Sequence, residues 1–120
     1  MRTKLLLNNA DASINQTSDP VQLDQRVEWL LEMVKTGTDG DPKVFIEQGF
    51  NQGGTYNPTP PTDWFVIANK CLTTGEFIID DSPYSIESRN LKGNWFRMRL
   101  EPNGTTTGTL NALFAYKTFT

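Results

Sequence analysis

The chain has 120 residues, with 14 acidic and 11 basic side chains, a net charge of −3 and no histidine. This length predicts one domain, residues 1–120, with a buried core. The lack of histidine removes the commonest general base and the commonest metal ligand. Because Cys71 is the only cysteine, an internal disulfide and a cysteine-based zinc site are excluded. The mildly acidic balance lacks the basic stripe that nucleic-acid binding needs, so we expect no nucleic-acid partner.

The N-terminal residues predict a strand and then a loop. Residues 2–7 alternate as a first strand, and residues 8–19 are polar and predict a loop with a short extended piece near Ile14. The apolar run at 5–7 is far shorter than a signal-peptide core, and no segment approaches the ~20 apolar residues of a membrane span. We therefore expect a soluble protein with no membrane contact.

Residues 21–35 fit two kinds of secondary structure. Helical spacing of the apolar residues and Pro20 in a first turn favour a helix. A strand instead places Val27, Trp29, Leu31 and Met33 on one face. The turn-forming residues 36–42 are followed directly by another strand, which favours a hairpin with a long tip. We predict a strand and keep the helix as the alternative.

The middle of the chain predicts further strands separated by irregular segments. In 43–48, Val44 and Ile46 face inward, while Lys43 and Glu47 point out. Residues 63–68 are apolar on both faces, which predicts a central strand covered on both sides. Short strands are expected at 76–80 and 84–87, and the proline-rich stretch within 49–61 predicts an exposed loop.

The C-terminal residues alternate apolar and polar side chains over two stretches. Residues 94–100 and 108–120 each have period two, and the turn-forming residues 102–107 join them, which predicts a hairpin that ends the chain. Seven or eight strands at regular spacing predict an all-β, antiparallel β-sandwich of jelly-roll type. The predicted core comprises Val27, Trp29, Val44, Ile46, Phe96, Met98, Leu100, Leu110 and Phe114.

The acidic pairs of the sequence do not form a recognisable site for chemistry. Asp39-Gly40-Asp41 has the spacing of a calcium loop, but Phe50 stands where an EF-hand needs glutamate, so we interpret it as a turn. The sequence has no nucleophile elbow and no phosphate-binding loop. We expect no catalytic residue, no metal and no cofactor, and a hydrolase that uses carboxylates alone is the remaining enzymatic alternative.

Aromatic and cationic side chains on one predicted strand face indicate a contact surface. Trp95, Arg97 and Arg99 share the outward face, where a tryptophan beside arginines can anchor a protein partner or stack on a sugar ring. Tyr56 and Tyr84, near turns, are further candidates for the same role.

The two terminal strands are candidates for contacts between subunits. Edge strands present unpaired backbone groups, and neither 2–7 nor 108–120 carries prolines or clustered lysines that would blunt an edge. We expect at least one terminus to contact another subunit, with Leu6 and Phe119 as the residues to test. The alternative is that both termini pair inside one sandwich.

Four segments, in order, resemble strands and turns of small virion proteins of tailed bacteriophages. They are GTDGDPKVFIEQ at 37–48, FIIDDSPY at 77–84, WFRMRL at 95–100 and GTTTGTLNA at 104–112. The resemblance implies a non-enzymatic particle component of the capsid, neck or tail, made in the host cytoplasm and located in the virion. Its implied partners are other virion proteins, with a homo-oligomer or shell as the assembly. A carbohydrate- or receptor-binding module on the virion is the alternative function.

Overall fold

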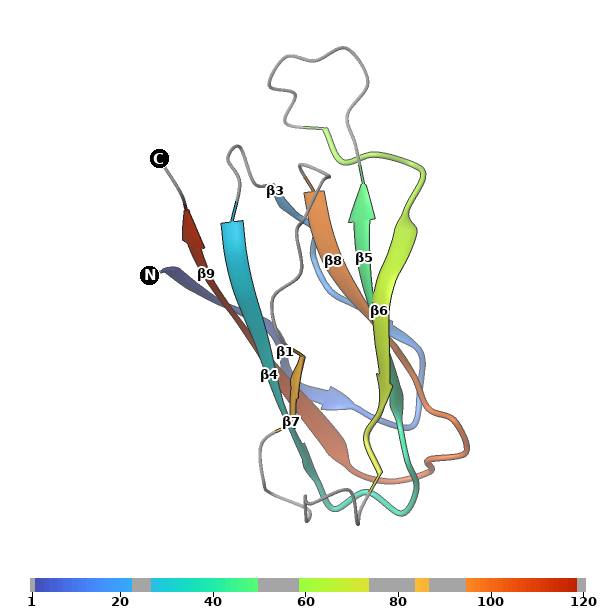
Figure 1. Cartoon of the computed structure of the whole chain (residues 1–120). Helices are drawn as coiled ribbons and strands as arrows, with labels where there is room; N and C mark the ends of the chain where they lie inside the picture. The colour runs from blue at the N-terminus through green and yellow to red at the C-terminus, as the bar shows by residue number, and fades with distance from the viewer. Residues whose placement is uncertain (1, 23–26, 50–58, 74–83, 87–94, 119–120) are drawn as a thin grey trace.

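The computed structural model describes residues 2–22, 27–49, 59–73, 84–86 and 95–118, and these contain strands and no helix (Figure 1). No helix long and apolar enough to cross a membrane is present in this part of the chain. The strands are β1 (Arg2–Asp11), β2 (Gln16–Thr17), β3 (Val21–Gln22), β4 (Val27–Thr36), β5 (Lys43–Gly49), β6 (Phe65–Cys71), β7 (Tyr84–Ile86), β8 (Trp95–Glu101) and β9 (Thr109–Thr118).

The strands form two antiparallel sheets that pack face to face (Figure 1). One sheet has the order β1-β9-β4-β7, and the other has the order β2-β8-β5-β6 with β3 also paired to β8. Ser18 joins β2 and β3 into one interrupted strand, because its N–H and Oγ bond the carbonyl and N–H of Met98, both at 2.9 Å. With these two counted as one strand, the order is that of an eight-stranded jelly roll, which confirms the predicted fold class.

The ambiguous segment 21–35 is extended wherever the structure describes it. β4 pairs with β9 over its whole length, from Val27 opposite Thr118 to Thr36 opposite Thr109. Trp29, Leu31 and Met33 are buried on its inner side, as period two requires. The strand prediction is therefore confirmed over these residues.

The two expected hairpins, by contrast, are wrong. β8 and β9 lie in opposite sheets, and so do β4 and β5, so each connecting loop crosses from one sheet to the other. Period two reports which side chains of a strand are buried, and it carries no information about which strand lies next to it. A hairpin within one sheet and a loop that crosses to the other sheet both satisfy the same burial pattern.

Three smaller expectations also need correction or fall outside the described residues. β6 is an edge strand and not a covered central one, and Phe65 and Val66 are 54% and 48% exposed. β1 continues to Asp11 through part of the expected loop, with Asn9 at φ 47° and its N–H bonded to Asn111 Oδ1 at 2.8 Å. The strand expected at 76–80 lies outside the described residues.

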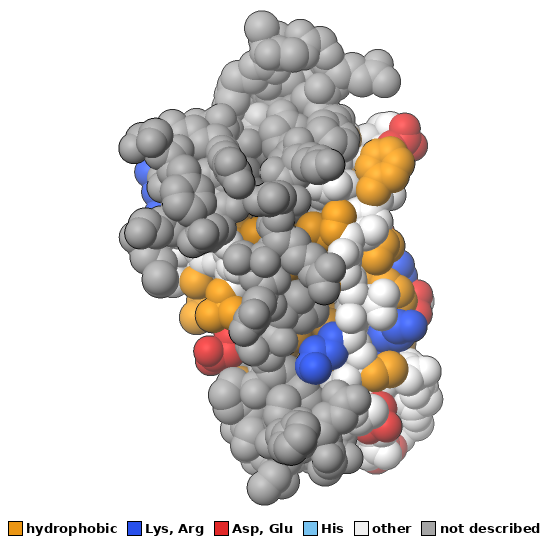
Figure 2. Space-filling view, in the orientation of Figure 1, with side chains coloured by type: hydrophobic (Ala, Val, Ile, Leu, Met, Phe, Trp, Pro, Cys, Tyr) orange, Lys and Arg blue, Asp and Glu red, His pale blue; other side chains and the backbone are white. Residues whose placement is uncertain are grey.

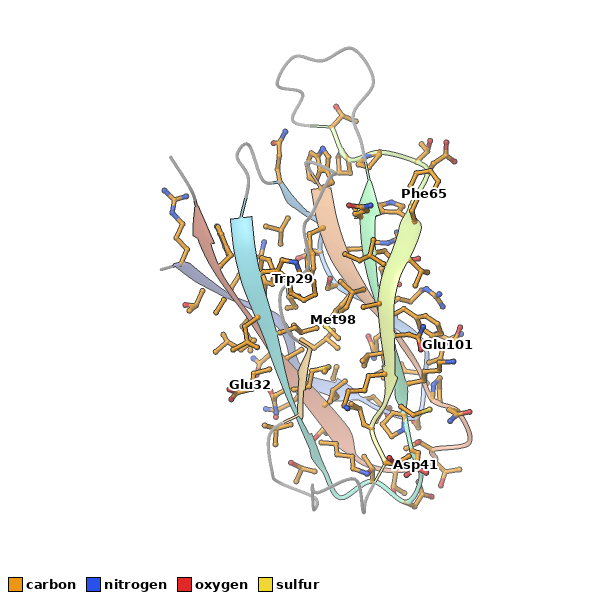
Figure 3. The ribbon with its side chains drawn as sticks, viewed as in Figure 1. Trp29, Glu32, Asp41, Phe65, Met98 and Glu101 are labelled. Carbon is orange, nitrogen blue, oxygen red and sulfur yellow. The ribbon has the colours of Figure 1, made fainter. Side chains whose placement is uncertain are left out.

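The core lies between the sheets and contains every predicted core residue whose side chain is described. Trp29 and Met98, which come from opposite sheets, both project into this space (Figure 3). At its centre the Phe96 and Phe114 rings stack with centroids 4.2 Å apart, and the Trp29 ring meets Phe96 edge-on at 5.4 Å. Such ring contacts add to the hydrophobic gain from burial and hold the two sheets at one spacing.

The two loops that cross between the sheets at one end of the sandwich are tied together by Asp39. Its carboxylate, on the β4–β5 loop, accepts bonds from the backbone N–H groups of Thr106 and Thr107 at 2.7 and 3.1 Å, and from the Thr106 hydroxyl. Thr107 Oγ1 returns a bond to the Gly37 carbonyl at 3.1 Å, and Asn103 Nδ2 bonds the Asp41 carbonyl at 2.9 Å. Asp39 is thus a link between loops as well as a turn residue.

The same loops approach so closely that one position admits only glycine. Gly108 has φ +104°, and a Cβ there would lie 2.8 Å from the Thr36 carbonyl oxygen and 2.7 Å from Thr38 Cγ2. Gly104, in the same loop, has φ +87° but nothing within 4 Å of an added Cβ. Substitution at Gly104 therefore measures backbone strain alone, whereas substitution at Gly108 measures backbone strain together with steric overlap.

We expect Gly108→Ala to lower the free energy of unfolding by about 3 kcal/mol or more, because overlap adds to the 1–3 kcal/mol cost of an unfavourable φ. Gly104→Ala, the matched control, should lose only about 1–2 kcal/mol. Urea unfolding of both variants measures the difference. Equal losses would contradict the close loop contact.

The Asp39 link also predicts a pH dependence. The hydrogen bonds from Thr106, side chain first and then backbone, lower the Asp39 pKa from 3.8 to about 2. A pKa lowered by folding stabilises the folded state above the unfolded pKa, and this stabilisation is lost as the pH falls through the folded value. Asp39→Asn should therefore lower the melting temperature at neutral pH, with the difference from wild type shrinking between pH 4 and 2.

Asp11→Asn is the control for this pH series. The pKa of Asp11 is also lowered, by the Ser13 side chain and then the Ser13 backbone, but these bonds join residues only two apart. Asp11→Asn should therefore lower the melting temperature at neutral pH less than Asp39→Asn, which removes a link between two loops. A pH-independent difference for Asp39→Asn would contradict the assigned role.

Candidate functional site

The most structured set of polar side chains lies on the outer face of the β2-β8-β5-β6 sheet. Register places Phe45 opposite Arg99 and Glu47 opposite Arg97, so the four side chains form a block across β5 and β8. Trp64, just before β6, lies beside them under Arg97. We call these five residues the arginine face.

Glu47 is the centre of the charges on the arginine face. Its Oε1 accepts a bond from Arg97 Nε at 2.8 Å and lies 3.7 Å from Arg99 Nε. Arg99 also binds Glu101, with Nη1 and Oε1 2.6 Å apart. The Glu47 side chain is only 7% exposed, against 25% and 29% for the two arginines, so the carboxylate lies beneath the guanidinium groups.

The guanidinium groups also cover the aromatic rings of this face. Arg97 Cζ lies 4.4 Å from the centroid of the Trp64 ring, and Arg99 Cζ lies 4.3 Å from that of Phe45. Lys43 Nζ reaches the Phe45 ring as well, at 5.1 Å. Cation–π contacts of this kind shield apolar rings with the chain's own charges. The arginine face is consequently an amphipathic surface whose aromatic rings are covered by cations of the same chain.

The structure brings together Arg97 and Arg99 but does not place Trp95 with them as an exposed anchor. Trp95 is 4% exposed, outside the core cluster, and its Nε1 makes no hydrogen bond among the described residues. The expectation of an exposed Trp95 is therefore wrong. Tyr56 and Phe119 lie outside the described residues, and Tyr84 lies in β7 with no description of its side chain.

Leu6, expected at a subunit contact, is buried, and Leu5 is exposed in its place. The pairing of β1 with β9 shifts between Leu5 and Leu7, and this bulge turns Leu6 and Leu7 both into the core. The terminal strand β9 is not an edge, because it lies between β1 and β4, whereas β1 is at the edge of this sheet among the described strands. The described parts of both terminal strands thus pair inside one sandwich, and the contact of a terminus with another subunit stays a prediction.

The outer face of the other sheet carries uncovered apolar side chains. Leu5, Leu30 and Leu113 are 49%, 39% and 39% exposed and come from β1, β4 and β9. Leu5 of β1 is directly opposite Leu113. On the other side of β9, Glu32 is directly opposite Leu113, so Leu30 lies diagonal to Leu113. We call these three residues the leucine patch. Hydrophobic side chains reach the surface at both lateral margins in the space-filling view (Figure 2).

These two surfaces have the features of surfaces that contact other molecules. Among the described residues, no group of three or more acidic, cysteine or histidine side chains could hold a metal ion. The Asp39 carboxylate, considered above as a calcium ligand, is instead bonded to Thr106 and Thr107. The arginine face can present fixed charges, and the leucine patch can bury apolar area.

Sequence reasoning missed two residues of the arginine face, Phe45 and Trp64, and one buried charge, Lys35. Phe45 could have been placed on the outer face, because Lys43 and Glu47 on either side of it were already assigned there. Lys35 continues the inner row of Trp29, Leu31 and Met33, and it is buried with Nζ 4.0 Å from Asp41 Oδ1. Trp64 had no local signal, because its contact with Arg97 depends on how distant strands are placed.

No family model and no curated protein matches the chain. The geometry of the two outer faces therefore carries the functional argument.

Removal of the Glu47 charge should destabilise the fold by about 1–3 kcal/mol, because Glu47→Gln leaves two partly buried guanidinium groups without their shared carboxylate. Glu101→Gln, at 44% exposure, removes an exposed partner of the same Arg99 and should cost about 0–1 kcal/mol. Urea unfolding measures both. Equal losses would contradict the central position of Glu47.

Proposed function

We propose that the protein is a non-enzymatic structural protein of a tailed-bacteriophage virion, acting through contacts with other proteins. The observation that carries the proposal is the leucine patch, an apolar cluster on a sheet face that antiparallel sheets ordinarily present to water with polar side chains. Clustered exposed apolar residues are typical of protein interaction sites.

The fold and the sequence add support of a different kind. Eight-stranded jelly rolls are used by viral capsid and lectin domains, which is an argument by analogy of fold. The resemblance of 37–48, 77–84, 95–100 and 104–112 to phage virion strands and turns favours the first of these uses. The capsid, neck and tail are all positions consistent with the proposal.

The carbohydrate- or receptor-binding alternative stays a prediction with less support. Sugar-binding sites stack aromatic faces against the ligand, whereas the Phe45 and Trp64 rings are already covered by Arg99 and Arg97. Trp95, the ring on which this alternative chiefly depended, is buried.

Mass spectrometry of purified particles of the phage that encodes the chain tests the proposal. We expect the protein in many copies per particle, at a ratio to the major capsid protein that is constant through successive purification steps. An abundant host cytoplasmic protein serves as the carry-over control. Loss of the chain in step with that control would contradict the proposal.

A further inference from the structure

The arginine face presents a cationic outer layer above a buried carboxylate. Glu47 is 7% exposed and lies beneath Arg97 and Arg99, whose side chains are 25% and 29% exposed. Lys43 adds a third cation on the same face. Of the two carboxylates in contact with the arginines, only Glu101 reaches the surface, at 44% exposure. What the face offers to another molecule is therefore mainly positive charge.

Both guanidinium groups keep hydrogen-bond donors that the chain does not use. Arg97 donates from Nε to Glu47, and its Nη1 and Nη2 have no partner among the described residues. Arg99 donates from Nη1 to Glu101, and its Nη2 has no partner in the same part of the chain. Each group is already oriented by an aromatic ring beneath it and by a carboxylate. Less side-chain freedom is therefore lost on binding than for an unsupported surface arginine.

We infer that the arginine face binds an acidic, extended segment of another protein, with carboxylates two residues apart. Arg97 and Arg99 are two residues apart on β8, about 7 Å along the strand, and an extended partner repeats its side chains at the same spacing. A planar carboxylate accepts parallel bonds from both Nη groups of one guanidinium. The inference rests on the proposed function, in which the protein acts through protein contacts, and it names the chemistry of one partner.

A second copy of this chain is not the partner that the spacing selects. The chain's own acidic residues two positions apart are Asp39 and Asp41. The Asp39 carboxylate is already bonded to the backbone of Thr106 and Thr107. The segment therefore belongs to a different protein.

A nucleic acid fits this face less well than an acidic protein segment. Single strands bind by stacking their bases on aromatic rings, and both rings here are already covered by guanidinium groups. A chain with a net charge of −3 also repels a long polyanion. A segment with two carboxylates, by contrast, interacts mainly with charges within one Debye length.

Titration with an alternating threonine–glutamate peptide tests this site, with NMR of the arginine Nε–H and tryptophan indole N–H signals as the measurement. We expect the peptide to shift the signals of Arg97, Arg99 and Trp64 with a millimolar dissociation constant, and added salt to weaken binding. The same peptide with glutamine in place of glutamate is the control for charge and should leave these signals unchanged. Inorganic phosphate and a single-stranded DNA oligonucleotide are titrated as the competing anionic ligands.

Three variants separate this site from the rest of the surface. Arg97→Gln should raise the dissociation constant of the peptide about fivefold or more, because it removes the unused pair of Nη donors. Glu101→Gln should lower it several-fold, because it removes a surface carboxylate that competes for Arg99, and such a gain of affinity cannot arise from loss of folding. Arg2→Gln is the matched control, because Arg2 is exposed on β1 of the opposite sheet, and it should leave the affinity unchanged.

Different results would overturn the partner and the site. The acidic protein segment is overturned by an absence of shifts at Arg97 and Arg99, by equal shifts with the glutamine peptide, or by tighter binding of phosphate or the oligonucleotide. An affinity that neither Arg97→Gln nor Glu101→Gln changes overturns the arginine face as the binding site.

These outcomes are separable from the proposed function. A chain that does not bind the peptide but is present in purified particles would overturn the acidic partner and leave the virion proposal standing. A chain that binds the peptide through Arg97 but is absent from particles would do the reverse.

Discussion

The ring contacts between the sheets are the constraint on which the other features of the molecule depend. Phe96 and Phe114 stack 4.2 Å apart across the core, with Trp29 against both. Because side chains of a strand alternate, burial of these rings fixes the direction of every neighbour on β4, β8 and β9. A slip of one residue in any of these strands would exchange core and surface residues along its whole length.

The outward-facing residues that result form two surfaces of different character. On β8, the alternation turns Arg97 and Arg99 outward, where β5 supplies Glu47 to pair with them and Phe45 for stacking. On β9 and β4 it turns Leu113 and Leu30 outward, and none of the described side chains covers them comparably. The Asp39 carboxylate bonds the two loops that cross between the sheets to each other, and so links the sheets that carry the two faces. The aromatic rings of one face are covered by the chain itself, and we propose that the other face makes contacts with another protein.

Local features of this fold followed from the sequence, whereas non-local ones did not. Alternation was sufficient to predict that Phe96, Met98 and Leu100 are buried, whereas the choice of a strand for residues 21–35 depended on the turn-forming residues and the strand that follow them. It could not predict that β8 and β9 lie in different sheets, since either connection satisfies the same burial pattern. The bulge beside Leu6 broke the alternation, so Leu6, expected at a subunit contact, is buried and Leu5 is exposed. The arginine face required the register of β5 against β8, which is set by packing between residues about fifty positions apart.

Solvent paramagnetic relaxation of side-chain protons tests the difference between open and self-covered surfaces most directly. The account predicts that a soluble paramagnetic agent relaxes the methyl protons of Leu5, Leu30 and Leu113 strongly, while the ring protons of Phe45 and Trp64, which Arg99 and Arg97 cover, are protected. Protection of the three leucine methyl groups, or accessibility of the two rings equal to theirs, would contradict the assignment of the leucine patch as the open surface.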